Sequence, residues 1–68
     1  MESNNREKAT FFQCLEDHEG DFVSVYLMGG YQYHGILQAV LEDGVEIKTY
    51  QNQSFIIPRH AISTVQTR

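Results

Sequence analysis

A change of hydrophobic period near Asp21 constrains the fold of this chain more than any other sequence feature. Before this point, apolar residues recur at helical spacing, and after it apolar and polar residues alternate as in half-buried strands. The longest alternating stretch, residues 31–41, has Gly35 in its interior. A glycine inside a strand is typical of a sharp bend, and small barrels need such a bend to close. The pattern therefore predicts a mainly β protein with a strongly bent sheet.

One helix and five antiparallel strands are expected from this pattern. The helix covers about residues 10–18, with Thr10 or Asn5 as its N-cap and Gly20 as its stop. The strands are expected at residues 23–28, 31–41, 45–50, 54–57 and 61–66. Turn residues separate them at positions 29–30, 42–44, 51–53 and 58–60. We expect residues 1–8 to form a flexible N-terminus and residues 9–68 to form one domain.

The size of the chain and its single cysteine bear on how the fold is stabilised. A barrel of 68 residues has a thin core and commonly needs disulfides, metal or oligomerisation. Cys14 is the only cysteine, so no disulfide can form within one chain. A lone thiol fits a reducing compartment, and no apolar run approaches the roughly 20 residues that span a bilayer. We therefore expect a cytoplasmic homo-oligomer that has no membrane partner.

Charge and motif content argue against several functions. Nine acidic and five basic residues give a net charge of −4, whereas a typical nucleic-acid-binding domain is basic. The sequence has no nucleophile–base pair, no glycine-rich phosphate loop and no ligand spacing typical of zinc. Its three histidines, His18, His34 and His60, are well separated in sequence. We expect no enzymatic activity, no catalytic residues, no metal site and no cofactor.

Two stretches distinguish among the Sm-like, SH3-like and OB-like barrels that periodicity alone leaves open. One resembles the first Sm box of the Sm/Lsm superfamily, through Val23, Val25, Leu27, Gly30, Tyr33, Gly35 and Leu37. The other is the run His-Ala-Ile-Ser-Thr-Val at residues 60–65, which follows Arg59 and resembles the second box of bacterial Hfq. The resemblance covers residues 9–66. It implies a five-stranded Sm-like barrel in a homohexameric ring that binds regulatory RNA and messenger RNA.

The resemblance implies an adenine-binding distal face. The residues that match it are Tyr26, Gly30, Tyr31, Gln32, Tyr33, His34 and Thr64. Tyr26 stands where the family stacks adenine, and His34 replaces a glutamine that reads the adenine edge. Base–aromatic stacking needs no net positive charge, so the acidity of the chain does not exclude A-rich RNA as a ligand. For Tyr33 a place in the core is an equal alternative, while the alternation with Val25 favours an exposed Tyr26.

The resemblance also implies a proximal, U-rich site at the pore, matched by Arg59 and His60. The stacking phenylalanine of the family falls at Gly44 or Val45 here, so the aromatic platform for uridine is missing. Pro58 replaces a tyrosine in a strand that pairs with the neighbouring subunit in the family, which removes one backbone donor. The alternative interpretation of Arg59 and His60 is a polar turn between two strands.

A third implied surface, an arginine-rich rim, is acidic in this chain. Glu16, Asp17 and Glu19 stand at the matching positions, and repeated around a ring they would repel RNA. We expect RNA annealing to be weak or absent. The sequence leaves open a ring that acts as a structural or protein-interaction module with weakened RNA binding. A monomeric SH3-like peptide binder is disfavoured by the second box.

Overall fold

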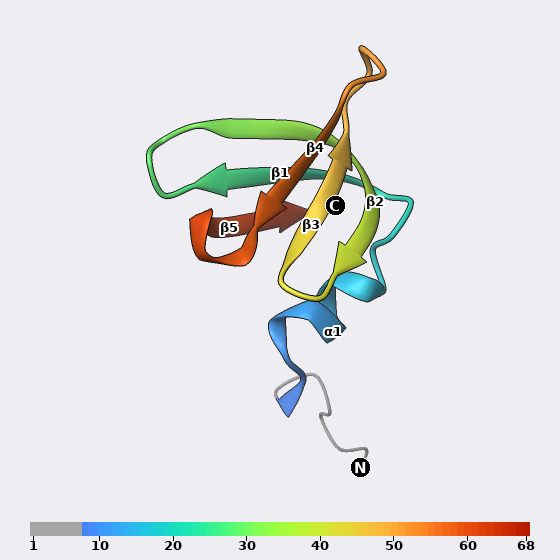
Figure 1. Cartoon of the computed structure of the whole chain (residues 1–68). Coiled ribbons are helices and arrows are strands. Elements are labelled where there is room, and N and C mark those ends of the chain that lie inside the picture. The colour runs from blue at the N-terminus through green and yellow to red at the C-terminus, as the bar shows by residue number, and fades with distance from the viewer. Residues whose placement is uncertain (1–7) are drawn as a thin grey trace.

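The computed structural model describes residues 8–68, which form a short helix and five strands (Figure 1). The elements in chain order are α1 (Phe11–Glu16), β1 (Phe22–Leu27), β2 (Gln32–Leu41), β3 (Gly44–Lys48), β4 (Ser54–Pro58), the 3-10 helix η2 (Arg59–Ala61) and β5 (Ile62–Thr67). The expected helix and five strands are thus all present. The third strand begins at Gly44, which the sequence pattern places in a turn, and ends two residues earlier than expected.

The helix α1 begins at a capping box. The hydroxyl of Thr10 accepts from the backbone N–H of Gln13 at 3.0 Å, and the Gln13 side chain accepts from the N–H of Thr10 at 3.0 Å. Thr10 is therefore the N-cap, while Asn5 and residues 1–7 of the expected flexible N-terminus lie outside the described residues. Gly20 has a φ of +90° and ends the turn that follows the helix.

The five strands form one antiparallel sheet in the order β4-β3-β2-β1-β5. β2 curves strongly through this sheet, with a register shift against β3 between Leu37 and Ala39 (Figure 1). The bend needs Gly35, because a side-chain carbon there would collide with the carbonyl oxygen of Lys48. The sheet does not close within one chain, since β4 and β5 do not pair and remain its two edges.

One side of the bent sheet encloses the hydrophobic core. Its buried residues are Leu15, Val23, Val25, Leu37, Val45, Ile47, Ile57 and Ile62. Because side chains alternate along a strand, the intervening residues point to the convex side. We call this convex surface the outward face, and it consists of Phe22, Ser24 and Tyr26 of β1, Gln32, His34 and Ile36 of β2, and Thr64 and Gln66 of β5.

Among residues 8–68, no helix is long and apolar enough to cross a membrane. The helix α1 has only six residues and lies against β2.

Candidate nucleic-acid interface

The outward face collects polar side chains from three strands around β1. Tyr26 is the cross-strand partner of Gln32 on β2 and of Thr64 on β5. Ser24 is the partner of His34 on β2, one pair further along the same strands. Cross-strand partners point to the same side of a sheet and lie within contact distance. The structure therefore brings together Tyr26, Gln32, His34 and Thr64, four of the seven residues predicted for adenine binding.

Side-chain hydrogen bonds hold the two rings of this group. The Tyr26 hydroxyl donates to Oε1 of Gln66 at 3.0 Å, and Oγ of Ser24 lies 2.7 Å from Nδ1 of His34. The rings of Tyr26 and His34 meet edge to face, with centroids 6.5 Å apart and an interplanar angle of 87°. We call Ser24, Tyr26, His34 and Gln66 the Tyr26 network. Ser24 and Gln66 were not among the predicted site residues, although both share the strand alternation of Tyr26.

A tight hairpin loop forms the end of the outward face between β1 and β2. The backbone N–H of Leu27 donates to the Tyr31 carbonyl at 2.8 Å, and the N–H of Gly30 donates to the Leu27 carbonyl at 3.0 Å. Gly30 has a φ of +94°, which fits a three-residue hairpin loop that ends in a left-handed residue. Tyr31 follows this loop and is 73% exposed. Gly30 and Tyr31 thus lie at the loop end of the face that carries Tyr26.

Tyr33 is separated from the other predicted site residues. Its cross-strand partner is the core residue Val25, and its ring packs on Phe55 with centroids 4.6 Å apart. It is half-buried beside the hydrophobic core. Of the two alternatives that the sequence left open for Tyr33, the structure has the core position.

The two predicted pore residues lie in η2, between β4 and β5. The Arg59 guanidinium stacks over the Phe11 ring, with its central carbon 4.1 Å from the ring centroid. Its Nη1 also donates to the Ile62 carbonyl at 3.3 Å. Arg59 therefore contacts α1 and β5, although it is exposed, as is the adjacent His60. We call this segment the Arg59–His60 turn.

No aromatic platform accompanies this turn at the position where the resemblance would place one. Gly44 and Val45 are both buried at the start of β3, and the Gly44 backbone packs closely against Ile57. The contact between Phe11 and Arg59 was not predicted, because the sequence pattern does not show how α1 packs on η2.

The acidic segment that begins at the last residue of α1 has a partly structural role. Oε2 of Glu19 accepts from the backbone N–H of Val40 at 3.0 Å, near the register shift in β2. His18 and Asp21 form a side-chain contact of 3.3 Å between Nδ1 and Oδ2. Glu16 and Asp17 are exposed, so this part of the surface is acidic. Within residues 8–68, no group of three or more His, Cys, Asp or Glu side chains is arranged to hold a metal ion.

The fold is similar to that of a protein of known structure. A crystal structure of Hfq, described as a pleiotropic translational regulator, superposes with a TM-score of 0.77 over 100% of both chains, at 24% sequence identity. No protein-family model matches the sequence, and no match is found among curated proteins. At this identity the likeness establishes the fold, which is the Sm-like fold of Hfq. It confirms the fold class and the structural resemblance inferred from the two boxes.

Proposed function

We propose that this chain binds single-stranded RNA on its outward face and prefers A-rich segments. The Tyr26 network is the observation that supports this function best. It holds the half-buried ring of Tyr26 beside the exposed His34 on the outward face, by hydrogen bonds of 3.0 and 2.7 Å. Stacking of a base on an aromatic side chain contributes about 1–3 kcal/mol and depends little on net charge. An acidic chain can therefore bind RNA at this surface.

The polar groups around Tyr26 suit the edge of adenine. When Ser24 donates to Nδ1 of His34, the other ring nitrogen carries the proton and is a donor toward a ligand. Gln32 and Thr64 flank Tyr26 and add an amide and a hydroxyl. Adenine presents both acceptors and an amino donor on its edges, so amide, hydroxyl and imidazole groups can pair with it.

We further propose that the chain assembles into a ring through the edges of its sheet. The Arg59 N–H donates to the Asp43 carbonyl at 2.7 Å, so these two residues form a hydrogen-bonded pair at the end of the antiparallel ladder between β3 and β4. Because hydrogen-bonded and non-hydrogen-bonded pairs alternate along such a ladder, the backbone groups of Ser54 and Ile56 point away from β3. Such groups on β4 can pair with β5 of a second copy, because unpaired edges are templates for another strand. Pro58 has no N–H to offer on this edge, at a cost of about 1 kcal/mol for one hydrogen bond.

We also propose a hexameric ring with a cytoplasmic role in post-transcriptional regulation by small RNAs, which is what the resemblance of the two sequence boxes implies. The Arg59–His60 turn is the proposed site for U-rich RNA, with weak affinity because its cation already contacts Phe11. The exposed acids Glu16 and Asp17 disfavour the approach of a second RNA strand, so we expect little annealing activity.

Fluorescence anisotropy with a labelled A-rich oligomer tests the proposal directly, with the same sequence in a duplex as the control. We expect micromolar or tighter binding of the single strand and much weaker binding of the duplex, whose bases cannot stack on Tyr26. Failure of A-rich and U-rich oligomers to bind at micromolar ring concentration would overturn the RNA proposal. Light scattering tests the ring separately: a monomer mass excludes it, and a ring without RNA binding supports the protein-interaction module instead.

A further inference from the structure

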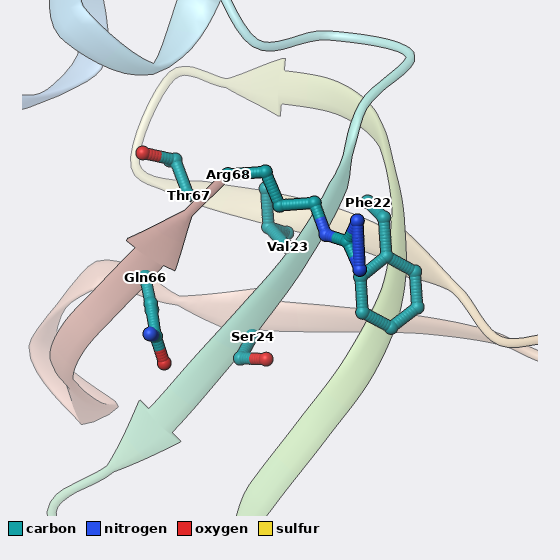
Figure 2. Close-up of a pocket in the computed structure, with 6 residues that line it drawn as sticks. All are labelled: Phe22, Val23, Ser24, Gln66, Thr67 and Arg68. Carbon is teal, nitrogen blue, oxygen red and sulfur yellow. The ribbon is translucent and has the colours of Figure 1, made fainter.

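The outward face continues past the Tyr26 network into a pocket at the start of β1 (Figure 2). The pocket has a volume of about 200 Å³ and is lined by Phe22, Val23, Ser24, Gln66, Thr67 and Arg68. Ser24 and Gln66 belong to both places, since each also holds one ring of the Tyr26 network. Tyr26 and Phe22 are four residues apart on β1, about 13 Å at the usual rise of a strand. The pocket is therefore continuous with the proposed adenine site.

Phe22 and Arg68 form an exposed aromatic–cation pair at this pocket. The Arg68 side chain reaches across to Phe22, and its guanidinium carbon lies 5.3 Å from the ring centroid (Figure 2). Phe22 is 39% exposed, so part of its ring is open to a ligand. Among residues 8–68, no Asp or Glu carboxylate lies within ion-pair distance of Arg68. Within the same residues its guanidinium donates no hydrogen bond, whereas Nη1 of Arg59 donates to the Ile62 carbonyl.

A second cation lies on the same surface beyond Phe22. Ile36 is the cross-strand partner of Phe22 on one side and of Lys48 on the other, so the three side chains share the outward face. Phe22 and Ile36 are both exposed apolar residues, at 39% and 36%. We call Arg68, Phe22, Ile36 and Lys48 the Phe22 strip. Two acidic residues are near the strip in sequence: Glu46 is two residues before Lys48 on β3, and the exposed Asp21 precedes Phe22.

We propose that the Phe22 strip binds further nucleotides of the RNA strand that occupies the Tyr26 network. A base packs on Phe22 and Ile36, while Arg68 and Lys48 bind the flanking phosphates. Exposed rings bordered by cations are the usual composition of surfaces that bind single-stranded nucleic acid. The inference rests on the proposed RNA-binding function and extends it. It assigns two of the five basic residues of this acidic chain to one ligand.

The salt dependence of RNA affinity tests the strip, because only phosphate binding releases counterions. For a labelled A-rich oligomer, we expect Arg68→Gln to lower affinity about three- to tenfold. The slope of log K against log salt should become shallower by about 0.7 for each phosphate that the variant no longer binds. Arg68→Lys keeps the charge and should retain the slope. Lys8→Gln, which removes an equal charge from the segment before α1, is the matched control and should leave the slope unchanged.

Phe22→Leu provides a second test, since it keeps an apolar side chain and removes only the ring. We expect it to lower affinity without changing the salt slope. Light scattering and circular dichroism on each variant exclude loss of the ring or of the fold, and Arg68→Gln alone suffices if Phe22→Leu does not fold. If the wild type binds A-rich RNA while Arg68→Gln and Phe22→Leu match it in affinity and slope, the strip is overturned and the proposed function stands. If the wild type binds no RNA, both are overturned.

Discussion

The outward face and the Arg59–His60 turn differ in whether their functional groups are free. On the outward face, hydrogen bonds orient Tyr26 and His34 while leaving exposed surface for a ligand. In the turn, the Arg59 guanidinium packs on the Phe11 ring and donates one hydrogen bond to the Ile62 carbonyl, while no side-chain hydrogen bond within residues 8–68 orients the exposed His60. The position of a basic residue in a motif therefore does not show which contacts its side chain already makes within the fold. On an acidic chain, pre-ordered stacking groups are the better basis for RNA binding.

The largest expected effect is that of Tyr26→Ala on A-rich binding. Removing the ring should cost about 1–3 kcal/mol for each base stacked on it, or roughly 5- to 150-fold in affinity. U-rich binding should not change. The matched control is Tyr50→Ala, because Tyr50 is 91% exposed in the turn between β3 and β4 and lies away from the network. If Tyr26→Ala and Tyr50→Ala lower the A-rich affinity equally in the anisotropy assay, the outward face is not the site of A-rich binding.

A smaller effect is expected when the support of His34 is removed. Ser24→Ala deletes the 2.7 Å contact to Nδ1, and the loss of one hydrogen bond is worth about 0.5–1.5 kcal/mol, or roughly two- to tenfold in A-rich affinity. His34→Gln keeps a donor and an acceptor and should bind better than His34→Ala. If His34→Gln and His34→Ala are equally weakened in the same titration, His34 does not read the base edge.

The strand positions and the two faces could be predicted from the sequence because side-chain direction alternates along a strand. The same alternation places Tyr26 on the outward face, where the structure has it half-buried. For Tyr33 the sequence left the core and the binding face equally open, and only the structure places it beside Val25 and Phe55. Gly35 marked the bend correctly, since its neighbour across the sheet leaves no room for a side chain.

Contacts between elements distant in sequence could not be predicted in this way. The stacking of Arg59 on Phe11 and of Arg68 on Phe22 depends on how segments that are distant in sequence pack together, and a local sequence pattern does not show this. The hydrogen bond from the Val40 N–H to Glu19 is of the same kind. The sequence showed which residue types were present in these regions, but not which of them lie in contact.

Removing the Phe11 ring should free the Arg59 guanidinium and therefore raise RNA affinity at the Arg59–His60 turn. Phe11→Leu keeps an apolar contact with the core but removes the ring, and a cation–π contact at an exposed site is worth about 0.5–1 kcal/mol. We expect U-rich affinity to rise about two- to fivefold and A-rich affinity to stay constant. Phe12→Leu changes the neighbouring ring, which does not lie under Arg59, and is the matched control. A rise in A-rich affinity alone would contradict the assignment.

The smallest effect is expected for His60→Ala. Its exposed imidazole contributes at most one hydrogen bond to a base, and water competes for that bond, so the loss should be about 0.5 kcal/mol. U-rich affinity should therefore fall by roughly twofold from an already weak value, and A-rich affinity should be unaffected in the same assay. A loss of A-rich binding as large as that of Tyr26→Ala would mean that the two regions act as one site.

Competition between the two RNAs tests most directly whether the outward face is the principal and separate site. A labelled A-rich oligomer is bound to the wild-type ring and challenged with unlabelled A-rich or U-rich oligomer of equal length. We expect the A-rich competitor to displace the label near the dissociation constant, and the U-rich competitor to leave it bound at the same concentration. Displacement by U-rich RNA at equal or lower concentration would contradict the separation of the two regions.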